Sequence, residues 1–213
     1  MLSHGLLRQA LSRCAPVAPQ AWRFEHDSHG RPRITCPEHA GIAFSLSRCP
    51  GMVAVVVSDQ GRCGIDVERA GRVSDTITTA RAFFSPAEQA LLMAAAPADR
   101  DRIFAAHWAL KEAWAKAMGR GLDLPVQRVG FELRQDGRVT MSLPPALGTA
   151  ADWHLELHHP TPDHVLAVAL DRAPQQPVAL GWCQTSCRRQ RRKPHRNGDI
   201  WRSADRRSTV RTT

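Results

Sequence analysis

Several features are missing from this 213-residue sequence, and each absence excludes a class of protein. No apolar run approaches the roughly 20 residues that a membrane-spanning helix needs. The longest run, around 53–57, predicts one buried strand instead. The first twenty residues contain no apolar segment followed by small residues, as a secretory signal would. We therefore expect a cytoplasmic protein with no membrane partner.

Paired cysteine motifs are also missing. The sequence has no CxxC, and Cys183 with Cys187 lacks the second pair that a zinc finger would need. A disulfide framework is not expected in a chain of this length without a secretory signal. We expect reduced and mostly buried thiols at all six cysteines, which are Cys14, Cys36, Cys49, Cys63, Cys183 and Cys187.

Lysine is scarce, since it supplies three of the 29 basic residues. Two of the three, Lys111 and Lys116, lie beside Glu112 in "HWALKEAWAKAMGRGL". Glu112 and Lys116 have the spacing of a helical surface ion pair, which contributes only about 0.3–0.5 kcal/mol. Such a pair explains a cation but not the choice of lysine over arginine. Because lysine is a compact and titratable charge, its use here favours a site that handles a phosphate or a proton.

The net charge of +9 belongs to the end of the chain. Residues 175–213 hold ten basic and two acidic residues, whereas residues 1–174 hold 19 and 18. The end segment has no periodicity and few apolar residues, so we expect it to be a disordered basic tail. A nucleic-acid-binding arm is an alternative function for it. The charge gives no information about the partners of the body, and we expect no nucleic acid there.

The body has the pattern of an α+β fold. Apolar or alternating segments predict strands, and the two at 51–58 and 63–68 are expected to form a hairpin. Ser85, Pro86 and Glu88 have the spacing of a helix start with a capping box. A longer helix follows Pro97 and ends at glycine. Further strands are expected at 42–47, 129–133, 139–143, 153–159 and 164–170.

The segment "GIDVE" contains the first candidate site residues. Alternation along a strand puts Asp66 and Glu68 on one face and turns Ile65 and Val67 into a core. Two neighbouring carboxylates repel each other unless water surrounds them or a cation lies between them. On a solvated surface the pair has no function, but the apolar neighbours indicate a half-buried site that favours a cation.

Three carboxylates with a lysine nearby suit a hard cation such as Mg²⁺ and a phosphate-bearing substrate. The three are Asp66, Glu68 and Glu112. Other basic and hydroxyl residues are candidates for binding the phosphates: Arg8, Arg31, Ser47, Arg48 and Lys116.

In this order and spacing, the motifs resemble those of the phosphopantetheinyl transferases, in particular the long, pseudo-dimeric type that acts on carrier proteins of peptide and polyketide synthesis. That family has an apolar-Gly-apolar-Asp-x-Glu strand and, some forty residues later, Trp or Phe followed by x-x-Lys-Glu-(Ala/Ser)-x-x-Lys. Here the matching segments are "GIDVE" and "WALKEAWAK". "GRP", "FSLSRC", "RAFFSPAE" and "GRGLDLP" also match, and the resemblance covers residues 5–172.

The resemblance implies two similar α/β halves, residues 1–74 and 75–174, with coenzyme A in the cleft between them. Asp66, Glu68 and Glu112 would bind Mg²⁺, and Lys116 would contact phosphate. Glu112 or Lys111 would help to deprotonate a serine of an apo acyl or peptidyl carrier protein. That serine would take the phosphopantetheine and release 3′,5′-ADP. Because both halves lie in one chain, we expect a monomer.

Two departures from the family pattern affect these expectations. Arg48 stands where the family usually has a histidine that contacts a nucleotide phosphate, and arginine can still bind phosphate. The family usually has another segment before the helix at "LLRQAL", and residues 1–74 are expected to lack it.

A metal-dependent phosphohydrolase is the remaining alternative. It would use the same carboxylates together with histidines, although these show no recognisable ligand spacing. The candidates are His107, His154, His158, His159 and His164.

Overall fold

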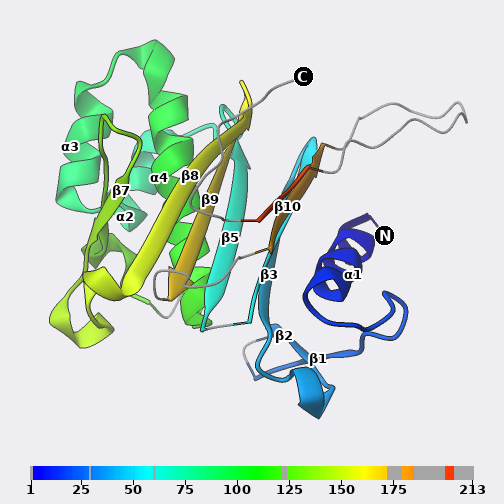
Figure 1. Ribbon diagram of the computed structural model, residues 1–213. Helices are drawn as coiled ribbons and strands as arrows, with labels where there is room; N and C mark the ends of the chain where they lie inside the picture. Colours follow the sequence, from blue (N-terminus) through cyan, green and yellow to red (C-terminus); the bar gives the residue numbers. More distant parts are fainter. Residues whose placement is uncertain are drawn as a thin grey trace, which may run out of the picture.

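The computed structural model of the protein describes residues 2–28, 30–59, 61–120, 124–171, 179–184 and 200–203. Helices and strands are mixed along the chain, as the α+β prediction requires (Figure 1). The helices are α1 (Leu2–Cys14), α2 (Thr76–Phe83), α3 (Pro86–Ala94) and α4 (Pro97–Met118). Short 3₁₀ turns are η1 (Pro37–His39), η3 (Val126–Arg128), η4 (Pro145–Leu147) and η5 (Ala150–Asp152). None of the helices in these ranges has the length and apolar composition that crossing a bilayer requires.

The strands form two larger sheets and two hairpins. One sheet has the order β11-β10-β4-β3, the other has the order β5-β9-β8, and β1-β2 and β6-β7 are the hairpins. In the first sheet, the strands are β3 (Ala43–Cys49), β4 (Met52–Ser58), β10 (Ala179–Gln184) and β11 (Ile200–Ser203). In the second, they are β5 (Cys63–Arg69), β8 (Trp153–Thr161) and β9 (His164–Asp171). The hairpin strands are β1 (Phe24–His26), β2 (Pro32–Ile34), β6 (Gly130–Leu133) and β7 (Val139–Ser142).

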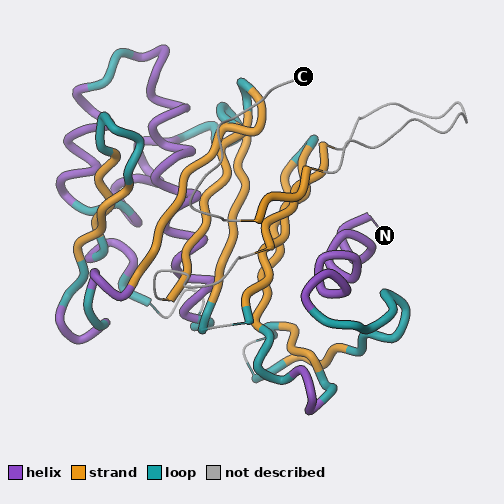
Figure 2. The backbone as a smooth tube through the Cα atoms, in the orientation of Figure 1, coloured by secondary structure: helices purple, strands orange, loops and turns teal. Residues whose placement is uncertain are grey.

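The two larger sheets pack face to face, and a helix covers the outer face of each one. Helix α1 lies against the sheet that contains β4, and α4 lies against the sheet that contains β5 (Figures 1 and 2). Strand β4 is buried along its whole length because one of its faces contacts α1 and the other contacts the second sheet. Leu6, Leu7 and Leu11 of α1 are buried in this contact.

Helix α4 approaches β5 so closely that only glycine fits between them. A Cβ atom on Gly64 would overlap the carbonyl oxygen of Ala113 and would lie 2.6 Å from the amide nitrogen of Ala117. The glycine of "GIDVE" therefore lets the strand touch the helix backbone. This contact brings the polar face of β5 next to the C-terminal turns of α4.

The predicted helix boundaries are confirmed. Ser85 and Glu88 form the capping box of α3, and α4 begins at Pro97. Helix α4 ends at Gly119, whose φ of 70° is left-handed and favours glycine.

The predicted hairpin over 51–68 is wrong. Strand β4 pairs with β3 and β10, whereas β5 pairs with β9. Both strands are buried on two faces, so they contact each other through apolar side chains from opposite sheets. Strand β5, which lies in the expected first half, thus pairs with a strand of the expected second half.

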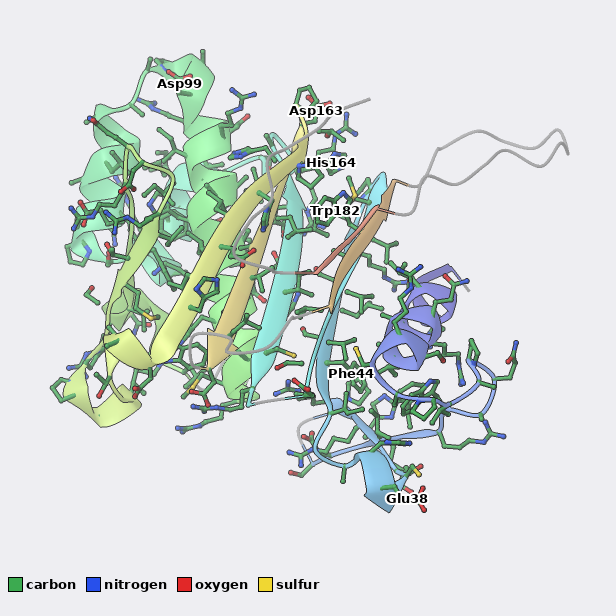
Figure 3. The ribbon with its side chains drawn as sticks, in the orientation of Figure 1. Glu38, Phe44, Asp99, Asp163, His164 and Trp182 are labelled. Carbon is green, nitrogen blue, oxygen red and sulfur yellow. The ribbon has the colours of Figure 1, made fainter. Side chains whose placement is uncertain are left out.

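The prediction of a disordered tail is wrong for two segments, 179–184 and 200–203, which are β10 and β11. Strand β10 pairs with β4 along its whole length, and Trp182 is buried in the cluster between the sheets (Figure 3). A short apolar segment can satisfy its backbone groups on an open strand edge even when its neighbours in sequence are basic. The other residues of the predicted tail, 185–199 and 204–213, lie outside the described residues, as do 172–178.

Candidate functional site

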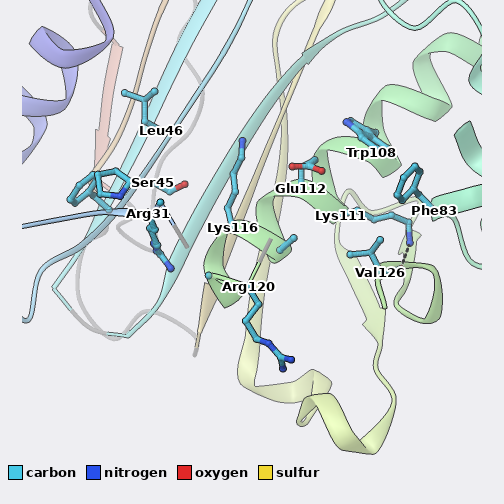
Figure 4. A pocket seen from close by; sticks show the side chains of 15 residues that line it. Arg31, Ser45, Leu46, Phe83, Trp108, Lys111, Glu112, Lys116, Arg120 and Val126 are labelled. Carbon is cyan, nitrogen blue, oxygen red and sulfur yellow. Dashed lines mark hydrogen bonds between the residues drawn. The ribbon is translucent and has the colours of Figure 1, made fainter. Parts of the chain in front are cut away.

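A pocket of about 650 Å³ lies between α4 and the strands β2 and β3. Figure 4 shows Glu112, Lys116 and Trp108 on the α4 side, with Arg31, Ser45 and Leu46 opposite them. The residues that line it are Gly30, Arg31, Pro32, Phe44, Ser45, Leu46, Phe83, Trp108, Lys111, Glu112, Ala115, Lys116, Gly119, Arg120 and Val126. The lining therefore comes from both sides of the boundary expected at residue 74.

Strand β5 and helix α4 bring the predicted carboxylates and Lys116 together. The Nζ of Lys116 lies 2.6 Å from Oδ1 of Asp66 and donates to Oγ of Ser47 at 3.1 Å. Ser47 in turn donates to the same Asp66 oxygen at 2.7 Å. Asp66 and Glu68 are both buried on the face of β5 that contacts α4, as alternation along the strand predicts.

Burial and neighbouring carboxylates raise the pKa values of Glu68 and Glu112. Burial raises the pKa of Glu68 to about 7, with a further increase from Asp66 and a smaller one from Glu112. Burial also raises the pKa of Glu112, and Asp66 adds to this effect. Lys116 lowers both pKa values, and Arg72 lowers that of Glu68. The positive charges of Lys116 and Arg72 therefore do not balance the negative charges of the three carboxylates.

Asp66 also has one oxygen with no partner. Its Oδ2 atom is buried and has no hydrogen bond within the described part of the chain. A buried carboxylate oxygen without a donor is costly unless something else binds it. The unpartnered oxygen, the surplus of negative charge and the all-oxygen ligand set fit a hard divalent cation such as Mg²⁺.

Arg31 lies in the pocket wall and links three elements. Its guanidinium donates to the carbonyl oxygens of Ala117 at 3.3 Å and Cys63 at 3.2 Å. A cation at the end of α4 also interacts favourably with the helix dipole. Arg31 therefore holds the segment before β2 against α4 and β5 while facing the pocket.

Ser47 contacts Lys116 but is not among the residues that line the pocket, and Arg8 and Arg48 also lie outside the lining. Arg8 donates to the carbonyl oxygens of Pro19 and Trp22 at 2.9 and 2.7 Å and so holds the loop after α1. Arg48 is exposed, and alternation along β3 puts it on the face opposite to Ser47. Their predicted roles gain no support from these positions.

Lys111 has different surroundings from Lys116. Its ammonium group is buried and lies 2.8 Å from Glu88 Oε2. It also donates to the carbonyl oxygen of Val126 at 3.0 Å (Figure 4) and to that of Val129 at 2.6 Å. Burial lowers the pKa of Lys111, whereas Glu88 raises it. The Lys111 ammonium is therefore paired with Glu88 and not with Asp66, Glu68 or Glu112, which indicates a structural role.

The histidines of the phosphohydrolase alternative have other partners. His107 is buried, with Nδ1 2.9 Å from the carbonyl oxygen of Ile103. His154 and His158 both contact Glu156, while His164 contacts Thr161 and the Pro50 carbonyl oxygen. His159 is exposed. A reaction that needs these imidazoles at the carboxylates is not favoured.

Sequence reasoning missed part of the pocket wall. Phe83 and Trp108 pack edge to face with their ring centroids 5.4 Å apart, and both line the pocket. Ser45 lines it too and accepts a hydrogen bond from the Ile65 amide at 3.2 Å. Trp108 lies one turn before Glu112, and that spacing was the available signal for an aromatic wall. Phe83 belongs to a separate helix, so only the tertiary fold could place it there.

Comparison with known proteins decides the family. A family model described as the 4′-phosphopantetheinyl transferase superfamily matches residues 62–169, which include both "GIDVE" and "WALKEAWAK". This protein belongs to the 4′-phosphopantetheinyl transferase superfamily. Its relatives place it with the long type within that superfamily.

Two relatives illustrate the likeness. The 4′-phosphopantetheinyl transferase HetI of a Nostoc species is 30% identical over 84% of this chain and 70% of its own length. The 4′-phosphopantetheinyl transferase Sfp of Bacillus subtilis is 31% identical over 68% of this chain and 62% of its own length. The chain therefore spans 70% of the length of the first relative and 62% of the length of the second. Among solved structures, holo-[acyl-carrier-protein] synthase of Thermotoga maritima matches with a TM-score of 0.43 and 26% identity, covering 55% of this chain and 65% of that one.

Proposed function

We propose that this phosphopantetheinyl transferase moves phosphopantetheine from coenzyme A to a serine of an apo acyl or peptidyl carrier protein, using Mg²⁺ and releasing 3′,5′-ADP. The observation that carries the proposal is the joining of the two family motifs. Lys116 of α4 contacts Asp66 of β5, and Asp66, Lys116 and Glu112 all affect the pKa of Glu68. Lys116 and Glu112 also line the pocket of about 650 Å³.

The carboxylates are the proposed metal ligands. Asp66, Glu68 and Glu112 offer only oxygen atoms, and Asp66 Oδ2 has no hydrogen-bond donor among the described residues. When bound there, Mg²⁺ would neutralise charge on the pyrophosphate of coenzyme A. Burial and, to a smaller extent, repulsion from Asp66 raise the pKa values of Glu68 and Glu112, and a bound metal would offset both effects.

Lys116 is the proposed phosphate-binding cation. Its side chain is about one-third exposed and lines the pocket, so it can contact a ligand there while its ammonium remains 2.6 Å from Asp66. Phosphoryl transfer depends largely on positioning and on stabilising charge, and a lysine beside the metal ligands would supply both. Arg31, on the opposite wall, is the second candidate for the phosphates.

Glu112 is the proposed acceptor of the serine proton. Glu112 lines the pocket, and its carboxylate has no hydrogen bond to any residue that the structure describes. Lys111, the other candidate, is held by Glu88 and two carbonyl oxygens. We therefore assign the proton to Glu112 and give Lys111 the task of holding α4 in place.

The pocket is the proposed coenzyme cleft between two halves at 1–74 and 75–174. Six of its lining residues lie between Gly30 and Leu46 in the first range, and nine lie between Phe83 and Val126 in the second. Phe83 and Trp108 would provide an apolar surface for the coenzyme. A monomer in the cytoplasm remains our expectation, because a single chain provides both walls of the pocket.

Intact-mass spectrometry tests the proposal directly. The chain is incubated with coenzyme A, Mg²⁺ and an apo carrier protein, with EDTA and Glu112→Gln as controls. A mass gain of one phosphopantetheine that both controls abolish is the expected result. A carrier that stays unmodified here, while a known phosphopantetheinyl transferase modifies it under the same conditions, would contradict the proposed activity.

A further inference from the structure

A second group of side chains that could bind a metal lies at η1 and the residue before it, in the connection from β2 to β3. Cys36, Glu38 and His39 each offer one ligand atom, and these three atoms all lie within 4.8 Å of one another. The group contains a sulfur, an oxygen and a nitrogen ligand. Among the described residues, no other group of three His, Cys, Asp or Glu side chains has its ligand atoms all within 4.8 Å of one another.

The turn itself brings the cysteine and the histidine together. The amide of His39 donates to the carbonyl oxygen of Cys36 at 3.0 Å, which closes a 3₁₀ turn. Side chains three residues apart eclipse one another in this conformation. The backbone therefore holds Cys36 and His39 on one side of the turn before any ligand binds.

Two of the ligand atoms already share a hydrogen. The thiol of Cys36 donates to Oε2 of Glu38, with sulfur and oxygen 3.3 Å apart. A divalent cation could take the place of that proton between the two atoms. Thiolate and carboxylate would then carry two negative charges, which match the charge of the ion, while neutral imidazole completes the set.

The His39 ring is positioned by the core and not by a hydrogen bond. It packs on the ring of Trp22 with centroids 5.3 Å apart, and Trp22 is buried and donates to Ser12 Oγ at 2.9 Å. No hydrogen bond to its nitrogens occurs among the described residues. Cys36 and His39 are half-buried and Glu38 is exposed, so an ion can reach the turn from solvent. Figure 3 shows Glu38 at the outer edge of the molecule.

We propose that Cys36, Glu38 and His39 bind a divalent transition-metal ion of the Zn²⁺ class, with a fourth position left to water. Zinc takes cysteine, histidine and carboxylate ligands at about 2.0–2.3 Å in a tetrahedron, so its ligand atoms lie about 3.5 Å apart. Small side-chain rotations bring three atoms that are within 4.8 Å to that spacing. The hard-cation site at Asp66 has no sulfur or nitrogen ligand, so the two sites would select different metals.

The proposed ion would stabilise the connection between β2 and β3. Strand β2 supplies Pro32 to the pocket, and β3 supplies Phe44, Ser45 and Leu46. A metal on η1 would hold the ends of these two strands without contacting the phosphates. The expected consequence is a rise in melting temperature when the ion binds.

A cobalt(II) titration tests the site independently of transferase activity. Every variant carries Cys183→Ser and Cys187→Ser, so that these two thiols cannot bind the added metal. Each protein is first stripped of metal and then saturated with Mg²⁺. Cobalt(II) should then produce a thiolate-to-metal absorption band that Zn²⁺ displaces. Cys36→Ser should abolish the band. His39→Ala should raise the Kd for cobalt(II) at least about tenfold, which equals about 1.4 kcal/mol of binding free energy.

The matched control is Cys14→Ser, which removes an exposed free cysteine elsewhere and should leave the band unchanged. The proposal is overturned if the parent chain shows no band, or if Cys36→Ser keeps it. Equal Zn²⁺ content in the parent chain, Cys36→Ser and His39→Ala after dialysis would also overturn it. Because Mg²⁺ occupies the carboxylates throughout, none of these outcomes depends on the proposed transfer reaction.

Discussion

Lys111 and Lys116 lie five residues apart on α4, but their ammonium groups have different surroundings. Lys116 is one-third exposed beside Asp66, whereas Lys111 is buried beside Glu88. The scarcity of lysine correctly drew attention to this segment. It could not separate the two residues, because the partner of Lys111 comes from another helix and its carbonyl acceptors follow α4 in sequence.

The first residue-scale prediction concerns Glu112. Glu112→Gln keeps the shape of the side chain but removes its charge, so transfer should fall about 100-fold or more. The melting temperature without metal should stay the same or rise, because the repulsion with Asp66 disappears. The measurements are carrier modification by intact mass and a thermal melt in EDTA. Glu25→Gln, on the exposed edge of β1, is the control, and retained transfer in Glu112→Gln would remove Glu112 from the reaction.

The second prediction concerns the choice of lysine at position 116. The Nζ atom lies between Asp66 Oδ1, Ser47 Oγ and the Ile65 carbonyl oxygen, at 2.6, 3.1 and 3.3 Å. A planar guanidinium is too large for these three contacts. Lys116→Arg should therefore lower kcat about tenfold or more, equal to about 1.4 kcal/mol of transition-state stabilisation. Steady-state kinetics with coenzyme A would measure it, and unchanged kcat would mean that any cation suffices there.

At the scale of single elements, the contact between β5 and α4 assembles the site. Local pattern correctly predicted the strand, the helix and the face that Asp66 and Glu68 share. It failed for the pairing of β4 and β5, because a strand buried on two faces shows no alternation to indicate its neighbour. Pairing of β5 with β9 joins residues about a hundred positions apart, which no turn signal can report.

Gly64 tests this contact. Gly64→Ala places a methyl group against the backbone of Ala113 and Ala117, so α4 must move away from β5. Overpacking of this kind should cost about 1–3 kcal/mol of folding free energy. Transfer should fall as well, because Asp66 and Lys116 separate. Urea denaturation and the carrier assay measure both effects.

Gly5 provides the matched control for that substitution. It lies in α1, and a Cβ atom there would meet nothing within 4 Å. Gly5→Ala should be neutral or stabilise by about 0.5–1 kcal/mol. If Gly64→Ala behaves like Gly5→Ala, the close approach of strand and helix is not as described.

The Glu88–Lys111 pair connects α3, α4 and the start of β6. Glu88 also accepts hydrogen bonds from the amides of Ser85 at 2.7 Å and Phe131 at 2.9 Å. Lys111→Met leaves a buried carboxylate without its cation, which should cost about 3–5 kcal/mol. The double variant Glu88→Gln/Lys111→Met should lose less, since no charge remains buried.

Chemical denaturation measures these two variants, and the carrier assay is run well below their melting temperatures. Near-normal transfer by the folded double variant is the expected result for a structural lysine. A normal melting temperature combined with lost transfer would instead return Lys111 to the catalytic residues.

At the scale of the whole molecule, polar residues lie at the rim of the interface between the sheets. His154, Glu156 and His158 alternate along β8 on the face opposite to Trp153 and Leu155, which pack toward α4. The histidines contact the two oxygens of Glu156 at 2.9 and 2.7 Å. These hydrogen bonds lower the pKa of Glu156 from 4.5 to about 2.

This shift predicts how stability depends on pH. A carboxyl group with a depressed pKa in the folded state contributes its full stability above its unfolded pKa, near 4.5. That contribution is lost as pH falls toward 2. The melting temperature of the parent chain should therefore exceed that of Glu156→Gln above pH 4.5, and the difference should shrink below it. Glu25→Gln is the control, and a difference that widens on acidification would contradict the assignment.

Hydrophobic patterning correctly indicated the mixed helix and strand architecture, and composition located the excess positive charge. It did not reveal that 179–184 forms a strand, because the surrounding arginines dominate the composition of that region. The aromatic pocket wall and the metal-ligating turn on η1 were missed for a similar reason. Phe83 reaches the pocket wall only through tertiary packing, and the ligand atoms of Cys36, Glu38 and His39 meet only once the backbone forms a turn.

The position of β10 has a consequence for the order in which the chain is synthesised. Strand β4 ends at Ser58, yet the strand that covers its second edge begins at Ala179. On the ribosome, β4 can pair with β3 early, while its other edge stays open until some 120 further residues have been added. An open apolar strand edge is prone to pair with other chains. Synthesis that stops before residue 179 should therefore yield a product that aggregates during translation, even though both carboxylate motifs are already present.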